Sequence, residues 1–304
     1  MRVLITGAAG FVGSFTASRF ATEGHQVTGF DRVARPLDPR HGVPPIPMIE
    51  GDIVDRARVL EAVDQVGAEG IVHTAAIIGQ EDGAADPLRM FQINVEGTLA
   101  VLEAIRARGL RLVYVSTATL YGMHPDLHPL TEDARPDPVG MYDTTKLMAE
   151  TLVVSYHKIY ALDTVAVRPG YVYGPNNSTG GYFLDRAFRG ESIIQPIGAD
   201  LPMDLTYVRD LAEGIYRAMT VRPITSRIFN ITGGVLRHRG EVAEIARRLV
   251  PGSRIEVGPG IPPQAHLRGP SVLTRAQSEL GYRPQYNLEA GMTDWLTWLR
   301  TPTV

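Results

Sequence analysis

Three glycines spaced three residues apart follow the first strand-like run of the chain, and they constrain its fold more than any other feature. Arg2–Thr6 (RVLIT) predicts a buried strand, and Phe11–Glu23 predicts a helix. Between these segments, Gly7, Gly10 and Gly13 allow a sharp backbone turn and a close approach of helix to strand. The N-terminus therefore predicts a tight strand–turn–helix unit.

The first half of the chain continues this alternation of β-branched runs with amphipathic stretches. Such alternation is typical of βαβ units and predicts an α/β fold, a Rossmann-type doubly wound parallel sheet. The further predicted strands are Gln26–Phe30, Pro47–Glu50, Gly70–His73, Arg111–Ser116 and Thr164–Arg168; the predicted helices are Arg56–Val66, Leu88–Arg108 and Met141–Tyr160; and Arg35–Pro47 reads as an irregular loop.

The alternation breaks after Gly174-Pro175, where Gly, Pro and Asn cluster. We therefore expect residues 1–175 to form the Rossmann domain, joined by a strand that returns near residues 228–231. Residues 176–304 are expected to form mainly a smaller substrate-binding lobe. Such a lobe would cover the carboxyl edge of the sheet, where open α/β folds bind ligands.

Composition excludes several classes of site and partner. The chain has no cysteine, which rules out disulfides, thiolate metal sites and cysteine nucleophiles, and no metal site is predicted. The net charge is -3 and Lys/Arg residues form no run, so no nucleic acid partner is expected. No stretch approaches the roughly 20 apolar residues of a membrane span, and no signal peptide is recognised. The expectation is a cytoplasmic protein without a membrane partner.

The glycine turn predicts a dinucleotide site. A helix N-terminus offers free N–H groups and partial positive charge to a pyrophosphate. Asp31 ends the second predicted strand about 20 residues further on, as the dinucleotide fingerprint requires. Its carboxylate can bind the ribose hydroxyls and would repel a 2′-phosphate, so NAD is favoured over NADP, although the adjacent Arg32 weakens that preference. The alternative is a turn that only packs helix on strand.

Two further segments are candidates for coenzyme contact. In Gly51-Asp52-Ile53, the carboxylate of Asp52 either reaches the adenine amine or caps the following helix. His73-Thr74-Ala75-Ala76 ends the fourth predicted strand with small side chains, which suit a backbone that passes beneath a coenzyme. We expect His73 itself to be packed rather than catalytic.

Tyr142 and Lys146 predict the catalytic pair. Residues at i and i+4 share one helix face. A free tyrosine has a pKa near 10, and a nearby ammonium lowers it toward the range of a useful base. The hydroxyls of Ser116 and Thr117 follow the fifth predicted strand, where one of them can orient the reacting oxygen. The alternatives are a solvated Tyr–Lys surface pair and ordinary loop capping by the hydroxyls.

These motifs together resemble the extended short-chain dehydrogenase/reductase family, the NAD-dependent epimerase/dehydratases. The resemblance covers most of the chain. Beyond the glycine turn and the Tyr142–Lys146 pair, its motifs are Asp31, Gly51-Asp52-Ile53, His73-Thr74-Ala75-Ala76, Asn94-Val95-Glu96-Gly97-Thr98, Ser116-Thr117-Ala118 with Tyr121-Gly122, Arg168-Pro169-Gly170-Tyr171-Val172-Tyr173-Gly174-Pro175, Tyr207-Val208-Arg209-Asp210-Leu211-Ala212 and Leu280-Gly281-Tyr282-x-Pro284.

The resemblance implies a role for each matching residue. Thr117 would orient the substrate, Tyr142 would be the acid/base, and Lys146 would hold the nicotinamide ribose and tune Tyr142. The predicted helices Leu88–Arg108 and Met141–Tyr160 would form a homodimer surface. The candidate coenzyme-binding residues are Gly7, Gly10, Phe11, Val12, Gly13, Asp31, Arg32, Asp52, Ile53, Thr74, Ala75, Ala76, Asn94, Tyr142, Lys146, Pro169 and Val172.

Two departures from the family pattern bear on the substrate. Family members that act on nucleotide sugars usually carry Asn at the position of Tyr171 and Arg at the position of Met203, and that Arg faces the diphosphate. Loss of a bidentate phosphate ligand is not a neutral change. Leu201-Pro202-Met203 is more similar to the family's small-substrate dehydrogenases. We therefore expect a small sugar-like, sugar-acid or hydroxy-acid substrate.

Three functional hypotheses follow. The first is an NAD-dependent dehydrogenase acting at a secondary hydroxyl of a small molecule. The second is a nucleotide-sugar 4-epimerase with tightly held NAD, and the third a non-catalytic dinucleotide sensor, which the presence of both Tyr142 and Lys146 disfavours. The candidate substrate contacts, each with a structural alternative, are Arg168, Tyr171, Asn176, Asn177, Thr179, Arg186, Arg209 and Arg268.

Overall fold

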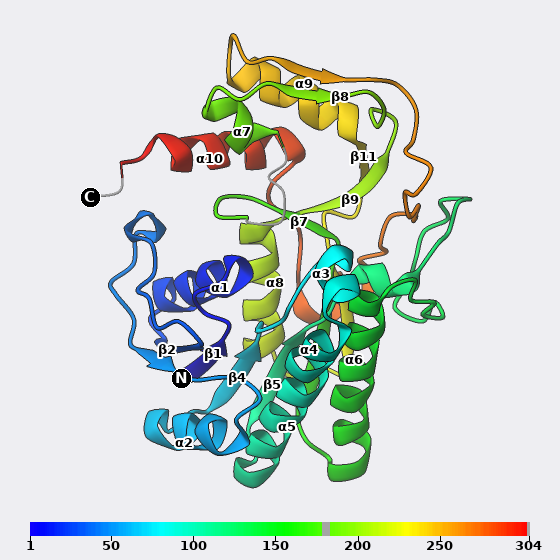
Figure 1. The fold of residues 1–304 in the computed structure, drawn as a ribbon. Coiled ribbons are helices and arrows are strands. Elements are labelled where there is room, and N and C mark those ends of the chain that lie inside the picture. Colours follow the sequence, from blue (N-terminus) through cyan, green and yellow to red (C-terminus); the bar gives the residue numbers. More distant parts are fainter. Residues whose placement is uncertain (178–182, 303–304) are drawn as a thin grey trace.

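A parallel β-sheet forms the centre of the molecule. The computed structural model describes residues 1–177 and 183–302, and within them seven parallel strands stand in the order β10-β6-β5-β4-β1-β2-β3 (Figure 1). The order reverses between β1 and β4, which creates a crevice at their carboxyl ends. The strands are β1 (Arg2–Thr6), β2 (Gln26–Asp31), β3 (Met48–Glu50), β4 (Gly70–His73), β5 (Arg111–Val115), β6 (Thr164–Pro169) and β10 (Ile228–Ile231).

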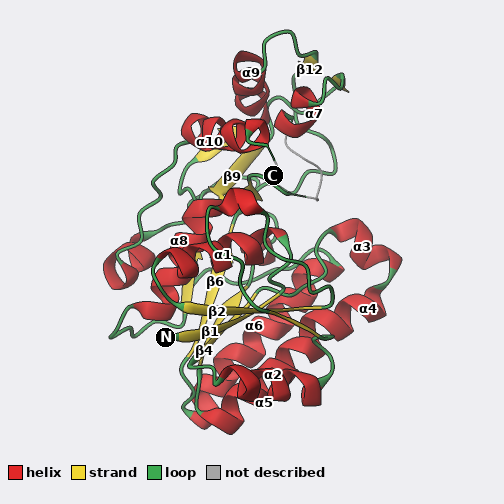
Figure 2. Cartoon of the chain, turned by 90° about the vertical axis from the view of Figure 1, so that its left-hand side faces the viewer, coloured by secondary structure: helices red, strands yellow, loops and turns green. Residues whose placement is uncertain are grey.

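Helices cover both faces of this sheet, which confirms the doubly wound Rossmann-type fold (Figure 2). One face packs against α2 (Arg56–Val66), α5 (Gly97–Arg108) and α6 (Met141–Tyr160). The other face packs against α1 (Phe11–Thr22) and α8 (Val208–Thr220). Both faces are apolar because a parallel sheet is buried on both sides.

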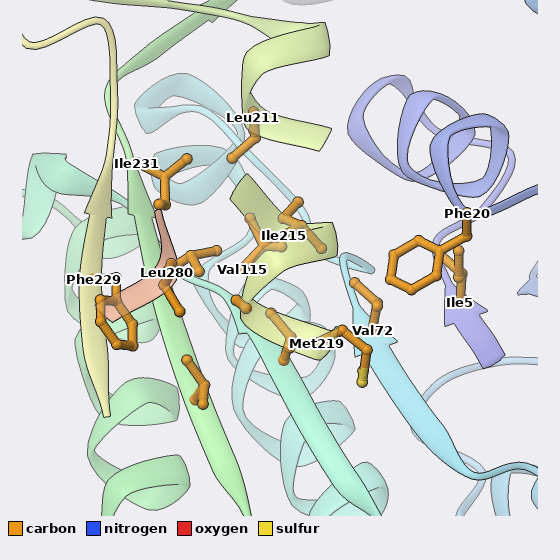
Figure 3. Packing of buried hydrophobic residues seen from close by; sticks show 14 of the residues in the cluster. Ile5, Phe20, Val72, Val115, Leu211, Ile215, Met219, Phe229, Ile231 and Leu280 are labelled. Atoms are coloured by element: carbon orange, nitrogen blue, oxygen red, sulfur yellow. The ribbon is translucent and has the colours of Figure 1, made fainter. Parts of the chain in front are cut away.

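The packing on the α1/α8 face joins segments that are far apart in the sequence. Figure 3 shows Ile5 and Val72 of the sheet in one cluster with Phe20 of α1, with Ile215 and Met219 of α8, and with Phe229 of β10 and Leu280. The strand expected near residues 228–231 is present as β10. The expectation of a single returning strand was incomplete, because α8 and the π-helical turn η4 (Ala276–Leu280) also pack on the sheet.

The predicted helix Leu88–Arg108 is interrupted in the structure. It consists of α4 (Pro87–Phe91), a π-helical turn η2 (Gln92–Glu96) and α5. Asp86 caps α4 by accepting a hydrogen bond from the Arg89 N–H, and Pro87 suits the first helical position. The periodicity could not reveal the π turn, which positions the buried Asn94. The short helix α3 (Gln80–Ala85), which contains Gly83, was not predicted.

The second half of the chain builds a lobe at the carboxyl end of the main strands (Figure 1). Its core gathers Tyr173, Tyr207 and Trp295, all at most 3% exposed. In the described residues, no helix is long and apolar enough to span a membrane. The lobe contains β7 (Tyr171–Tyr173), β8 (Ile193–Gln195), β9 (Pro202–Tyr207), β11 (Leu236–His238), β12 (Ile255–Val257), α7 (Leu184–Phe188), α9 (Arg239–Leu249) and α10 (Leu288–Arg300).

Candidate active site

The glycine turn between β1 and α1 has the geometry of an anion cradle. Gly7 has φ +72°, and a Cβ on Gly13 would lie 2.1 Å from the Gly7 carbonyl oxygen, so both positions require glycine. Gly10 is the N-cap of α1, and no described side chain caps that helix end. The first-turn N–H groups of a helix have no intrahelical acceptor. They are therefore available to a pyrophosphate, which fits the expected NAD.

Asp31 lies directly against this turn. Its Oδ2 accepts a hydrogen bond of 2.9 Å from the Ala9 N–H. The same residue Ala9 receives a 2.8 Å hydrogen bond at its carbonyl oxygen from Arg35 Nη2. From the sequence, Arg32 was a candidate coenzyme contact and Arg35 was not, because an irregular loop gives no indication of where its side chains point. Acidic and basic groups thus flank the turn together.

Asn94 is wholly engaged within the protein. It is 1% exposed, its Oδ1 accepts from the Ile77 N–H at 2.9 Å, and its Nδ2 donates to the Ile77 carbonyl at 2.9 Å and to Thr145 Oγ1 at 3.0 Å. Its side chain therefore ties the segment after β4, which includes Thr74–Ala76, to the helix that carries Tyr142. Any effect of Asn94 on a coenzyme would pass through this segment.

The structure of the segment after β3 excludes one of the two roles considered for Asp52, that of a helix cap. Asp55, not Asp52, caps α2 by accepting from the Arg58 N–H at 3.0 Å. Asp52 instead pairs with Arg89 at 3.0 Å and accepts from the Val54 N–H at 3.2 Å. The helix-cap interpretation of Asp52 was therefore wrong, because α2 begins three residues later than that role needs. The neighbouring Ile53 is 5% exposed, with its side chain in the core.

His73 is packed, as expected. It is 1% exposed, and its two ring nitrogens lie 2.6 Å from Thr6 Oγ1 and 3.1 Å from Thr98 Oγ1. Burial, with a contribution from the charge of Lys146, lowers its pKa to about 3. His73 is thus a neutral link between β4, β1 and α5.

The structure brings Thr117, Tyr142 and Lys146 together. Thr117 follows β5 and is 4% exposed, while Tyr142 lies in the first turn of α6 and remains partly exposed. The two side chains are close enough to affect each other electrostatically. Lys146 is 3% exposed, donates from Nζ to the Val115 carbonyl at 2.6 Å, and lies 4.3 Å from the centre of the Tyr114 ring. The pair is therefore not a solvated surface pair.

Burial dominates the pKa values of both Tyr142 and Lys146. Burial raises the pKa of Tyr142 to about 12, a hydrogen bond with Thr117 opposes the rise, and the charge of Asp143 adds to it. Burial likewise lowers the pKa of Lys146 to about 7, against the charge of Glu150. From the sequence, Lys146 was expected to lower the pKa of Tyr142. In the structure, burial is the largest cause of the Tyr142 shift, and Lys146 is not among its causes.

Thr119, one of the hydroxyl residues that follow β5, and Asp143 extend the site. Thr119 Oγ1 lies 2.9 Å from Thr117 Oγ1 and donates a short hydrogen bond to the carboxylate of Asp143, which is 1% exposed. A carboxylate only accepts, so the Thr119 oxygen is left to accept the Thr117 proton, and the Thr117 oxygen is left as an acceptor that faces Tyr142. For Asp143, the only signal in the sequence was its position inside Tyr-x-x-x-Lys.

A recess opens beside Thr119. Its lining includes Tyr171, Asp204, His266 and Arg268. Arg268 Nη2 donates to the Tyr171 hydroxyl at 2.7 Å, with the guanidinium 5.4 Å from the centre of that ring. Two of the candidate substrate contacts thus meet at the site, although they lie far apart in the sequence.

Arg168 does not reach the site. It is 2% exposed and forms a buried ion pair of 2.5 Å with Glu150. The hypothesis of a substrate contact is therefore wrong for Arg168, since its guanidinium is also bound by Tyr121 and the Glu132 carbonyl.

The remaining candidates are scattered. Arg186 pairs with Glu191 at the surface, and Arg209 pairs with Asp294 at 2.7 Å. Asn177 is 8% exposed and donates to the Val172 carbonyl at 3.1 Å. None of these three lines the recess beside Thr119 in the described part of the chain.

The other predicted positions fall around the same edge of the sheet. Pro169 ends β6 in the core, and Val172 lies half-buried in β7. Asn176 occupies a left-handed turn with φ +63°, and Thr179 lies outside the described residues. Met203 is 2% exposed in the lobe core, so it offers no substitute for a phosphate-binding arginine.

Comparison with known proteins agrees with this geometry. The family model "NAD dependent epimerase/dehydratase family" matches residues 3–232. UDP-glucose 4-epimerase of Mycolicibacterium smegmatis is 30% identical over 99% of this chain and 99% of that protein. UDP-glucose 4-epimerase of Corynebacterium glutamicum is 30% identical over 94% and 92%, respectively. The crystal structure of Thermus thermophilus UDP-glucose 4-epimerase in complex with NAD is similar with a TM-score of 0.87 and 28% identity, over 99% of each chain.

Proposed function

This chain belongs to the NAD-dependent epimerase/dehydratase family, and on that premise we propose that it transfers a hydride at a secondary hydroxyl of a sugar-like substrate. The observation that carries the proposal is the proximity of Thr117 and Tyr142 at the carboxyl end of β5, with Lys146 buried beside them and bonded to the Val115 carbonyl. When bound, NAD supplies the hydride acceptor, and the protein supplies position and proton transfer.

Tyr142 is the proposed acid/base. A pKa raised to about 12 keeps the phenol protonated at neutral pH, so Tyr142 is ready to donate its proton to a substrate oxygen. In the oxidation direction Tyr142 must first release its own proton before its oxygen can take the hydroxyl proton, while Thr117 holds the substrate oxygen. A positioned proton relay of this kind typically contributes about 100- to 10,000-fold.

The residues of the proposed coenzyme site surround the crevice between β1 and β4. The turn Gly7–Gly13 would bind the pyrophosphate, and Asp31 the adenine ribose. Lys146 would bind the nicotinamide ribose, and the segment Thr74–Ala76 would line the path between the two ends.

Relatives over the whole chain favour a nucleotide-sugar 4-epimerase. Two curated relatives, each named UDP-glucose 4-epimerase, match the chain nearly end to end. In a 4-epimerase the proton leaves the hydroxyl oxygen while the hydride leaves the carbon that bears it. The hydride then returns to the opposite face of that carbon and the proton to the oxygen, so Tyr142 acts first as base and then as acid. No NADH accumulates in such a reaction.

A small-substrate dehydrogenase is the second candidate. It is favoured by Met203, whose buried thioether stands where a phosphate-binding arginine is usual, and by Tyr171, which engages Arg268. A guanidinium in the recess suits a carboxylate. This candidate releases NADH at each turnover.

One experiment separates the candidates and tests the chemistry. The purified protein is incubated with NAD and UDP-glucose, UDP-galactose, UDP-glucuronate, or a panel of sugar acids and hydroxy acids. Sugar interconversion without reduced-nicotinamide absorbance indicates the epimerase, and net absorbance the dehydrogenase. For the substrate found, Tyr142→Phe should reduce kcat by at least about 100-fold. Unchanged turnover in this variant would remove the acid/base role and revive the sensor hypothesis.

A homodimer through α4 and α6 is proposed as well. These helices expose the apolar side chains of Leu88, Met148, Ile159 and Tyr160, each at least 41% exposed. Apolar surface of this kind is typical of an interface. Sedimentation should give twice the mass of one chain, and Ile159→Asp should shift the protein to the monomer.

A further inference from the structure

The loop between η3 (Ala118–Tyr121) and α6 carries a group of metal-ligating side chains that the proposed catalysis does not use. His124, Asp126 and His128 alternate along this loop, which projects from the side of the molecule (Figure 1). One ligand atom from each residue lies within 4.8 Å of the other two. Together they offer two imidazoles and one carboxylate.

Hydrogen bonds determine which ring nitrogens of the two histidines carry a proton. His124 Nε2 lies 3.1 Å from the Tyr121 carbonyl oxygen, which only accepts, so Nε2 carries the proton and Nδ1 has a lone pair. Metal-bound histidines characteristically donate their other N–H to such a carbonyl. His128 Nδ1 lies 2.9 Å from both carboxylate oxygens of Asp126, which only accept, so Nδ1 carries the proton in the metal-free state. A metal ion would therefore bind His128 through Nε2 or release the Nδ1 proton, and Asp126 would turn its carboxylate toward the metal.

The backbone of the loop is held in place. The His124 N–H donates to the Leu267 carbonyl at 2.7 Å, and the Leu127 N–H donates to the His124 carbonyl at 2.9 Å. Leu127 adopts φ +54°, a left-handed conformation that turns the chain between the two histidines. A Cβ on Gly269 would lie 1.9 Å from the His128 carbonyl oxygen, so the loop packs closely on the neighbouring segment. Much of the ordering needed for a three-ligand site is thus already present.

We propose that His124, Asp126 and His128 bind a divalent transition-metal ion of the Zn²⁺ class. Imidazole and carboxylate donors suit Zn²⁺, Ni²⁺ and Cu²⁺, whereas Mg²⁺ and Ca²⁺ require more oxygen ligands. Zinc bonds of about 2.0–2.2 Å place neighbouring ligand atoms about 3.3 Å apart, which small rotations of these half-exposed side chains achieve. Water would complete the coordination.

The site adjoins the recess through the segment that the loop packs on. Leu267, which holds the His124 N–H, precedes Arg268, and Arg268 Nη1 lies 3.4 Å from the Gly122 carbonyl oxygen at the start of the loop. Metal binding would therefore stabilise the backbone on which Arg268 rests. The binding itself does not depend on the proposed function.

Isothermal titration of the full chain, freed of any affinity tag and treated with EDTA, tests the site with ZnCl₂ and with MgCl₂. One zinc ion per chain should bind, and magnesium should not. His128→Gln and Asp126→Asn should each weaken zinc binding at least tenfold, whereas the matched control His157→Gln should not.

Two results would overturn the proposal. One is the lack of saturable zinc binding. The other is zinc binding that His128→Gln and Asp126→Asn leave unchanged, or that His157→Gln weakens equally. Because these loop side chains are half-exposed and the measurement needs no turnover, neither unfolding nor a wrong substrate assignment would explain such results.

Discussion

The carboxylate of Asp143 accepts a hydrogen bond from the hydroxyl of Thr119, and this contact fixes the direction of the hydroxyl chain that ends at Tyr142. A hydrogen bond to a charged group contributes about 1.5–3 kcal/mol. We expect Thr119→Val to lower kcat about 10- to 100-fold, because Thr117 loses its orientation. Stopped-flow measurement of the hydride-transfer step checks this.

Thr119→Ser is the matched control for this positioning role. Serine keeps the hydroxyl, so it should restore most of the rate, while the KM for NAD should stay the same in both variants. Equal losses in Thr119→Ser and Thr119→Val would mean that packing, and not the hydroxyl chain, is what the residue contributes.

Asp31 should determine coenzyme choice. Its carboxylate lies against the glycine turn and would repel a 2′-phosphate. Asp31→Ser should therefore shift the ratio of kcat/KM for NAD over NADP by at least about tenfold toward NADP, since a repulsive element is removed. Steady-state kinetics with both coenzymes measures the ratio, with Asp55→Ser, at the cap of α2, as the control. An unchanged ratio would place the ribose elsewhere.

Substitutions at Glu150 and at Arg268 should affect different properties. The first should lower stability, and the second should weaken substrate binding. Glu150→Ala leaves the buried guanidinium of Arg168 without its partner and should lower the free energy of unfolding by about 3–5 kcal/mol. Arg268→Ala should change that free energy by about 0.5 kcal/mol or less, yet raise the KM for substrate. Urea unfolding and steady-state kinetics on both variants measure the two effects. Equal destabilisation would argue against the recess as the substrate site.

His41 should make the fold sensitive to acid. It is 7% exposed between the rings of Phe15 and Trp298, and burial lowers its pKa to about 4. The unfolded chain, with a histidine pKa near 6.5, takes up this proton first as the pH falls. Stability is therefore full above about pH 6.5 and is lost toward pH 4, by about 2 kcal/mol between pH 7 and pH 5.

His41→Phe is the variant that isolates this effect. Neither ring nitrogen of His41 has a hydrogen-bond partner among the described residues, so phenylalanine fits the aromatic cluster without losing one. Urea unfolding at pH 7 and pH 5 should show about 2 kcal/mol less loss in the variant. If wild type and variant lose stability equally, His41 is not the group that titrates.

Local sequence patterns were sufficient to predict the regular helices and strands of the first half of the chain. Helix α6 begins and ends where its periodicity predicted, as does β4, because each segment buries one continuous apolar surface. The π turn at Gln92–Glu96 and the strands of the lobe were not predicted. A π turn changes the residues per turn over too few positions for a periodicity to register, and the short strands β7 and β11 owe their pairing to the distant β9.

The sequence by itself determined the parallel sheet and the glycine turn, because local spacing and the alternation of strands and helices suffice to specify them. It indicated Tyr142 and Lys146 through their spacing, and Thr117 through the resemblance to a family. Only the tertiary structure decided which charged groups are buried. It sequestered Arg168 with Glu150, brought Arg268 to Tyr171, and raised the pKa of Tyr142 where an ammonium in water would have lowered it. Desolvation depends on what the rest of the chain packs around a group, and no local pattern contains that information.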